Sequence, residues 1–397
     1  MALKNCWRKK KVESKITTDI YRKRIHSIKQ EQKSAFKRKS NVAGTAVKHR
    51  LSSGVNWLLL IPCIFIEIIR HLPSWIMELF HFCPKKAPQA IPDDSFLIVG
   101  HRGAAAYEIE NTIPSFEQAL NRYGANSLEI DICMTGDSQL VVWHDWEPDS
   151  TVAIARQLGL EPDVMCKPFT PGDGDKRKPV HELTLEELRD NYGFSLKKGK
   201  PGKLDAVIPT LREFFEWSGE QEKLRCLFLD VKTPRENKDL VPVMMKEIKS
   251  LFDEFKPEFT IIFLTPEKEI LGALKEAAKD LNYSFDTDLP LFLVLDPLSF
   301  GCVQKAIDLG NNYASIGRPP IFQLGPWTSY RRVVAHDVQL KEAHNASSET
   351  PVNGVIAWTI NRRREMKCLI KLGVDGILTD KPDQLHEVFR EESRGAI

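Results

Sequence analysis

From residue 96 onward, short runs rich in Val, Ile, Leu and Phe alternate with amphipathic stretches. Nine runs have the length and composition of β-strands, and they lie at 96–101, 127–133, 140–145, 226–232, 260–265, 291–295, 314–317, 355–360 and 375–380. Helical patterns separate most of them, for example at 113–123 and 365–373. Repeated strand and helix units of this kind predict an α/β fold built on a parallel sheet.

The second and third runs break the alternation. Only residues 134–139 lie between them, which is too short for a parallel crossover, whereas Gly136-Asp137 suits a hairpin. One of these two strands therefore cannot belong to the parallel sheet, which leaves eight parallel strands. Eight strands predict a (β/α)8 TIM barrel with a hairpin and loop insertion after the second strand, and chemistry at the C-terminal strand ends.

The chain of 397 residues is longer than one barrel of about 250 residues requires. Its 42% hydrophobic and 28% charged residues exclude a collagenous, disordered or polytopic membrane protein. We expect four regions: a basic, disordered arm (1–54), a hydrophobic membrane-anchor segment (55–83), a linker (84–95) and the barrel (96–393), which carries an insertion at 146–207.

The net charge of +2 conceals an uneven distribution, because the first fifty residues carry +13 and the remainder −11. The arm has little apolar periodicity, and such basic segments attract anionic lipid or nucleic acid, or act only as solubilising tails. The neighbouring segment decides between these interpretations.

Residues 57–69 read WLLLIPCIFIEII, but this apolar run falls short of the roughly 20 residues that span a bilayer. Glu67 and Arg70 make a clean span costlier, and Pro73 divides the stretch. A re-entrant or interfacial anchor fits best, and a helix docked on the soluble domain is the alternative. Beside a basic arm, such an anchor favours a membrane surface as the partner, with no nucleic acid expected.

The excess of positive charge keeps the arm in the cytosol. A re-entrant anchor returns the barrel to the cytosol, whereas a full span would put it outside. We therefore expect a membrane-associated protein whose barrel faces the cytosol. The eight cysteines are scattered without a CxxC pair, so reduced thiols are the default expectation.

Acidic residues interrupt two strongly apolar predicted strands. Glu129 and Asp131 lie two residues apart and would project to the same side, and Asp230 ends a neighbouring strand. Surface salt bridges explain these residues poorly, because an unpaired charge within an apolar strand is costly. Three carboxylates with room for water predict a Mg²⁺ or Ca²⁺ site rather than a zinc site.

Two histidines and two cations accompany these acids at the strand ends: His101, Arg102, His144 and Lys232. Imidazoles titrate near neutral pH and can divide acid and base roles. The cations supply the positive charge that a phosphate diester needs when charge develops on its oxygens. Together with a metal site, this set of residues predicts phosphoester cleavage.

Several motifs, in this order, resemble the glycerophosphodiester phosphodiesterase family over about 290 residues: HRG at 101–103, ENT at 110–112, ExD at 129–131, VVWHD at 141–145, WT at 358–359 and GVDGILTD at 373–380. The resemblance implies a metal-dependent phosphoric diester hydrolase. Such an enzyme would cleave glycerophosphodiesters to glycerol phosphate and an alcohol in phospholipid metabolism. The alternative is a lysophospholipase D that releases lysophosphatidic acid from membrane lysophospholipids.

By position, the resemblance implies roles for ten residues. The metal ligands would be Glu129, Asp131 and Asp230; the acid and base pair would be His144 and His101 respectively; the phosphate ligands would be Arg102 and Lys232; Trp358 would pack against the glycerol or acyl part; and Glu110 and Asn111 would add a ligand or a contact to one. A core role is the alternative for Trp358.

The chain departs from the family pattern in two places. Asp230 stands where the family usually has Glu, which shortens the ligand by one methylene and could alter metal preference or require a bridging water. Residues 146–207 follow the pattern poorly, so no substrate contact can be transferred there. A catalytically silent lipid-binding module is the rival hypothesis, but it would have lost an acid or a histidine, and none is missing.

Overall fold

A computed structural model describes Cys83 and residues 95–172, 174–198, 202–279, 283–290, 301–318 and 327–394. The predicted arm, nearly all of the predicted anchor segment and most of the predicted linker lie outside these residues. Within them, no helix combines the length and the apolar character that crossing a bilayer requires.

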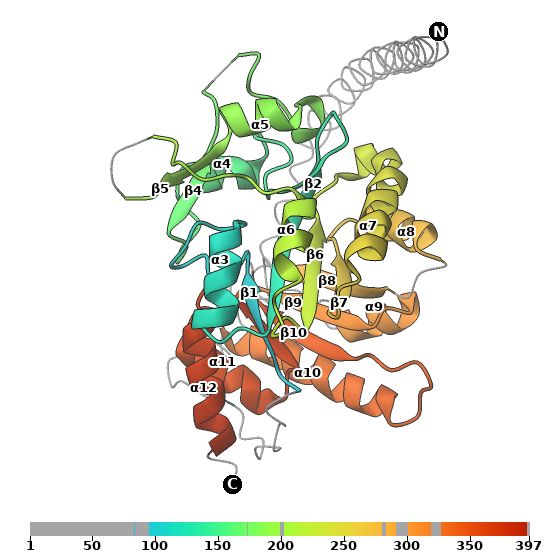
Figure 1. The fold of residues 1–397 in the computed structure, drawn as a ribbon. Helices are drawn as coiled ribbons and strands as arrows, with labels where there is room; N and C mark the ends of the chain where they lie inside the picture. Colours follow the sequence, from blue (N-terminus) through green and yellow to red (C-terminus); the bar gives the residue numbers. More distant parts are fainter. Residues whose placement is uncertain are drawn as a thin grey trace, which may run out of the picture. The chain divides into compact units, whose positions relative to one another are not determined.

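Eight parallel strands form a closed ring in the order β1, β2, β6, β7, β8, β9, β10, β11, and β11 pairs again with β1 (Figure 1). Their bounds are Leu97–His101, Ser127–Met134, Cys226–Val231, Thr260–Leu264, Ser284–Pro290, Tyr313–Gly317, Gly354–Trp358 and Gly376–Thr379 in ring order. The predicted TIM barrel is confirmed.

The short strand β3 (Leu140–Val142) lies outside the ring and pairs antiparallel with the end of β2, where Ile132 faces Val142. This is the predicted hairpin, and β3 is the partner that leaves the barrel. Its position places the residues that directly follow it, including His144, beside the C-terminal end of β2.

Helices follow most ring strands and cover the outside of the barrel (Figure 1). They are α3 (Ile113–Glu117), which continues as the π-helical turn η1 (Gln118–Arg122), α6 (Leu211–Ser218), α7 (Val241–Phe255) after the 3₁₀ turn η3 (Arg235–Leu240), α8 (Lys268–Ala277), α9 (Cys302–Leu309), α10 (Trp327–Asn345), α11 (Arg363–Leu372) and α12 (Pro382–Arg394).

Alternation along the strands separates two apolar layers. Residues such as Leu128, Ile130 and Ile132 of β2 belong to the layer between strands and helices, and the opposite parity, including Val99 and Phe228, fills the barrel interior. Glu129 and Asp131 alternate with the outer-layer residues of β2 and therefore point inward. Asp230 and His101 also point inward, because each lies two residues after an interior residue, Phe228 and Val99 respectively. The same alternation that places apolar side chains in the outer layer thus brings these four polar side chains together inside the barrel.

Strand β8 was not predicted, because its sequence SFDTDLP contains two acids and a proline. Phe285 packs in the outer layer, so Asp286 and Asp288 have the inward parity. The predicted strand at 291–295 lies outside the described residues. A strand with apolar residues outside and acids inside has no apolar run for a sequence search to detect.

Between β3 and α6 the chain forms a small substructure of its own. It contains α4 (Thr151–Gln157), the 3₁₀ turn η2 (Val180–Glu182), α5 (Leu185–Asn191) and the antiparallel pair β4 (Cys166–Phe169) and β5 (Gly193–Leu196). Trp143 packs edge-on against Phe194 at 5.3 Å between ring centroids within a separate apolar core. In Figure 1 this substructure lies over one end of the barrel.

The expectation of reduced cysteines is wrong for one pair. Cys83 and Cys368 of α11 form a disulfide, with their Cα atoms 5.9 Å apart. No spacing motif could predict a bond between residues 285 positions apart. Four other cysteines are free and buried, as expected: Cys133, Cys166, Cys226 and Cys302.

Breaking this disulfide is expected to lower the melting temperature by several degrees, because a native disulfide typically contributes about 2–4 kcal/mol. Calorimetry should show that dithiothreitol lowers the melting temperature of the wild type but not of Cys83→Ser. Equal melting temperatures for the wild type and this variant without reductant would show that the bond does not stabilise the fold.

Candidate active site

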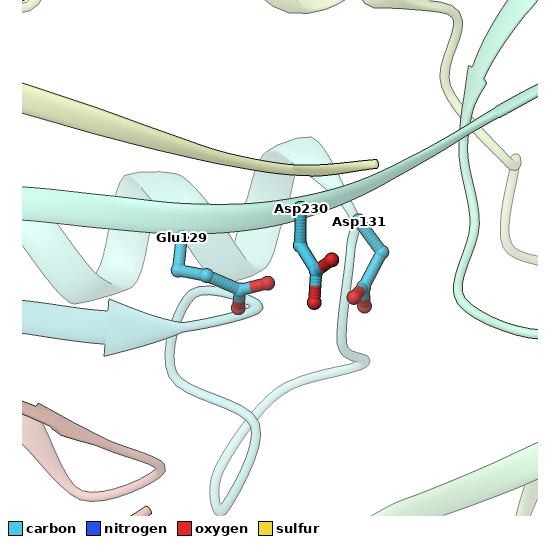
Figure 2. A group of neighbouring side chains, drawn as sticks. All are labelled: Glu129, Asp131 and Asp230. Carbon is cyan, nitrogen blue, oxygen red and sulfur yellow. The ribbon is translucent and has the colours of Figure 1, made fainter. Parts of the chain in front are cut away.

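Three carboxylates from two neighbouring strands converge inside the barrel (Figure 2). Asp131 on β2 is in register with Asp230 on β6, and Glu129 is in register with His101 on β1. One oxygen from each of Glu129, Asp131 and Asp230 lies within 4.8 Å of the others, and all three residues are buried. The shorter side chain of Asp230 therefore still reaches the group.

The chemistry of this triad fits a hard divalent cation. Oδ1 of Asp230 is buried without a hydrogen-bond partner, and carboxylate oxygens are the ligands that Mg²⁺ and Ca²⁺ prefer. Burial and the neighbouring Asp131 charge raise the pKa of Glu129. A bound cation would relieve this repulsion, so Glu129, Asp131 and Asp230 are the residues that would hold it.

Lys232 lies at the edge of the triad. Its Nζ contacts Oδ1 of Asp131 at 2.9 Å and also contacts Asp230. Burial lowers the pKa of Lys232, but Asp131 and Asp230 outweigh it, so the pKa is raised and the side chain stays charged. Asn111 donates from Nδ2 to Asp131 Oδ2 at 2.7 Å, which fixes the orientation of that carboxylate.

His101 is held from two sides. Its Nδ1 lies 2.6 Å from Oδ1 of Asp380, and its Nε2 lies 3.9 Å from Glu129. Burial and Arg102 lower the pKa of His101, but Asp380 and Glu129 raise it further, so the net shift is upward. Contact with Asp380 through Nδ1 turns Nε2 toward the carboxylate triad.

His144 is held by its neighbour in sequence. Nδ1 of His144 lies 2.6 Å from Oδ1 of Asp145, which leaves Nε2 for the substrate. Burial and the charges of Arg156, Lys232 and Arg102 lower the pKa of His144 to about 3. An anion bound beside His144 would raise this pKa again, because negative charge favours the protonated form.

Arg102 occupies a tight turn after β1. Its backbone has φ 52° and is followed by Gly103 at φ 89°, where a Cβ would meet Ser115 Oγ at 2.4 Å. The Arg102 N–H donates to Glu129 Oε2 at 3.0 Å, which ties the turn to the triad. Glycine at 103 is required because only it fits both the left-handed conformation and this close approach.

The Arg102 guanidinium is already surrounded by acids. Nε lies 3.0 Å from Asp131, and Nη1 contacts Glu110 at 3.0 Å and Glu161 at 3.1 Å. A phosphate ligand would therefore have to approach through Nη2. Glu110 contacts the side chains of Arg102 and Arg156, and through Arg102 it is linked to Asp131 of the triad.

Arg156, on α4, is an unpredicted part of the site. Its fully buried guanidinium contacts Asp145 Oδ1 at 2.6 Å, Glu161 Oε2 at 2.8 Å and Glu110. Asp145 Oδ1 is the same atom that contacts His144. The segment 146–207, which follows the family pattern poorly, therefore fixes both the partner of His144 and, through Glu110 and Glu161, the position of Arg102.

Trp358 lies across the barrel from the triad, at the end of β10. Its Nε1 donates to Oδ1 of Asp288 on β8 at 2.8 Å. The intervening strand β9 carries Gly317 at the register position of Trp358, and a Cβ there would lie 2.3 Å from the indole ring. Gly317 and Asp288 therefore hold the indole across β9, partly exposed at the end of the barrel interior.

The structure thus gathers nine of the ten predicted residues at one end of the barrel, with Trp358 on the opposite wall. It adds five that the sequence did not assign: Asp145, Arg156, Glu161, Asp288 and Asp380. Asp145 and Asp380 end the motifs VVWHD and GVDGILTD, so a signal for them existed. Nothing in the sequence marked Arg156, Glu161 or Asp288.

The sequence is similar to those of known proteins. A glycerophosphodiester phosphodiesterase of Caldanaerobacter subterraneus subsp. tengcongensis is 27% identical over 304 residues, covering 74% of this chain and 98% of that protein. The mouse protein named lysophospholipase D GDPD1 is 24% identical over 317 residues, covering 74% of this chain and 86% of that protein.

Solved structures support the fold. A phosphodiesterase from Oleispira antarctica, crystallised with sn-glycerol-3-phosphate, superposes with a TM-score of 0.50 at 18% identity, covering 74% of this chain and 96% of that one. Residues 101–384 match the model of the glycerophosphoryl diester phosphodiesterase family. Because this range covers more than half of the chain and contains every residue of the site, the protein belongs to the glycerophosphoryl diester phosphodiesterase family.

Proposed function

We propose that the protein hydrolyses glycerophosphodiesters to glycerol phosphate and an alcohol, using a divalent cation held by Glu129, Asp131 and Asp230. The observation that carries this proposal is the buried triad of carboxylates, with His101 in register beside it. When bound, the cation would supply positive charge to the phosphate oxygens. Lys232, which contacts two of the triad residues, would add a second positive charge.

His101 and His144 are proposed as the pair that moves protons. Each presents Nε2 because a carboxylate accepts from its Nδ1, so both rings have fixed orientations. In the proposed division, His144 protonates the departing alkoxide and His101 activates the attacking water. Arg102 and Lys232 would bind the phosphate, and Trp358 would pack against the glycerol or acyl part.

Cleavage of lysophospholipids is the second candidate activity. It is favoured by the relatives named lysophospholipase D, among them the mouse protein. The two activities differ in the substrate's acyl chain, so kcat/KM on glycerophosphocholine and on lysophosphatidylcholine will separate them. Turnover of neither compound would contradict both and favour a lipid-binding module without catalysis.

Metal removal is expected to abolish turnover, because the phosphate oxygens would lose the positive charge that the cation supplies. Activity after EDTA treatment should return with Mg²⁺, Ca²⁺ or Mn²⁺, and the order of effectiveness will identify the preferred ion. Asp230→Asn should fail to recover, whereas Asp230→Glu keeps the charge and should recover with altered metal preference. Full activity of the Asp230→Asn variant would remove this residue from the ligand set.

Membrane attachment through residues 55–83 and the basic arm is also proposed, with the barrel facing the cytosol as the sequence favours. The Cys83–Cys368 disulfide weighs against the cytosolic side, because disulfides are rare in that compartment. Protease protection of the barrel in sealed membrane vesicles, with and without detergent, will decide between the two sides.

A further inference from the structure

The segment between β3 and α6 exposes an unusual share of apolar side chains. Among the described residues, the exposed large hydrophobic side chains within 146–207 are Val152, Ile154, Leu158, Leu160, Leu196 and Val207, and elsewhere they are only Val243 and Leu309. Single exposed apolar residues are normal on soluble proteins, but a concentration of them in one small substructure marks an interaction surface.

Helix α4 is inverted relative to an ordinary surface helix. Its charged Arg156 is buried, while Ile154 is 42% exposed and Leu158 is 67% exposed. Ile154 and Leu158 are four residues apart and so share one face of the helix. A helix of a soluble domain normally turns this face toward the core.

One further exposed leucine follows this face. Leu160 comes directly after α4 and Gly159 and is 59% exposed. Lys197 lies next to this leucine, because its side-chain carbons are beside Gly159 and its Nζ contacts the carbonyl of Glu161. We call Ile154, Leu158 and Leu160 the apolar patch.

Lysines border the apolar patch. The side chains of Lys167 and Lys197 both lie next to Gly159, the residue that separates Leu158 from Leu160 in the sequence. Lys198 follows them and is exposed. Apolar side chains surrounded by lysines are typical of surfaces that enter the headgroup region of an anionic bilayer, where the aliphatic parts are buried and the ammonium groups remain among the phosphates.

We propose that the apolar patch docks on an anionic lipid bilayer and delivers membrane-embedded substrate to the barrel. This inference rests on the proposed function in its lysophospholipid form. The connection to catalysis is short, because α4 carries exposed Ile154 of the patch and also buried Arg156, which contacts the partner of His144.

The first test measures docking without requiring activity. Hydrogen exchange of the full chain is recorded with vesicles of phosphatidylcholine alone and with vesicles of equal parts phosphatidylcholine and phosphatidylglycerol. Slower exchange within 151–160 and 193–198 on the mixed vesicles supports the proposal, with α7 as the internal reference. Unchanged exchange in these segments contradicts it, whether or not the protein cleaves any phosphodiester.

The second test uses a double variant, Leu158→Ser with Leu160→Ser, in the full chain. On lysophosphatidylcholine within mixed vesicles, the lipid concentration for half-maximal rate should rise about tenfold or more, as expected for losing buried leucines. Turnover of water-soluble glycerophosphocholine should stay unchanged. Val243→Ser, at a similarly exposed position on α7, is the matched control and should alter neither.

Two outcomes would assign the apolar patch to another partner. Sedimentation that shows a dimer of the wild type, lost in the double variant without lipid, would make the patch an interface between copies. Protection of 151–160 in the full chain without vesicles, lost when residues 1–82 are deleted, would mean that the chain's own apolar segment covers it. Either result overturns the lipid proposal.

Discussion

Replacing His144 with alanine is expected to lower kcat on glycerophosphocholine by about 10²–10⁴-fold, the usual contribution of a positioned proton donor. The reason is geometric: Asp145 accepts from Nδ1, so Nε2 is the nitrogen that can donate to the leaving group. The carboxylate triad does not include His144, so metal binding should persist. Calorimetric titration of the variant with Mg²⁺ or Ca²⁺ checks that expectation.

The role of His144 as the acid can be separated from a structural role by changing the leaving group. p-Nitrophenolate leaves as a stable anion without protonation, so His144→Ala should lose far less activity on a p-nitrophenyl phosphodiester than on glycerophosphocholine. His101→Ala is the matched control, because a missing base should lower both rates. Equal losses on both substrates in His144→Ala would contradict the acid role and favour the reverse division of labour.

The barrel was predictable because its strands repeat one signal. Apolar residues pack on both faces of most ring strands, and such strands appear in sequence as continuous apolar runs. The hairpin was predictable from the short connection at 134–139. Strand β8 escaped because Asp286 and Asp288 occupy its inward face, where a sequence search expects apolar residues.

The candidate site was predictable where motifs cover it and not elsewhere. The triad and His101 follow from acids and histidines at strand ends, since strand parity alone brings them together. Arg156 and Glu161 could not be found in this way, because they lie in a segment without motif and reach the site only through the folding of that segment. Asp288 could not be found either, because its link to the site is the hydrogen bond from Trp358, whose indole reaches it by lying against Gly317.

The unpredicted arginine gives the largest expected effect on stability. Replacing Arg156 with methionine leaves Glu110, Asp145 and Glu161 buried without their shared partner. Removing one side of a buried ion pair typically costs about 3–5 kcal/mol. Urea unfolding should show this loss, whereas Arg212→Ala, which removes an exposed pair with Glu254, should cost at most about 1 kcal/mol.

Arg156 is also expected to act on catalysis as a positioning residue, through Asp145 and His144. Arg156→Lys keeps the charge but cannot contact three carboxylates with one planar group, so it should remain folded and lose kcat on glycerophosphocholine. If Arg156 acts through His144, adding Arg156→Lys to His144→Ala should lower kcat little further. Full additivity of the two losses would show that Arg156 supports the fold but not the proton donor.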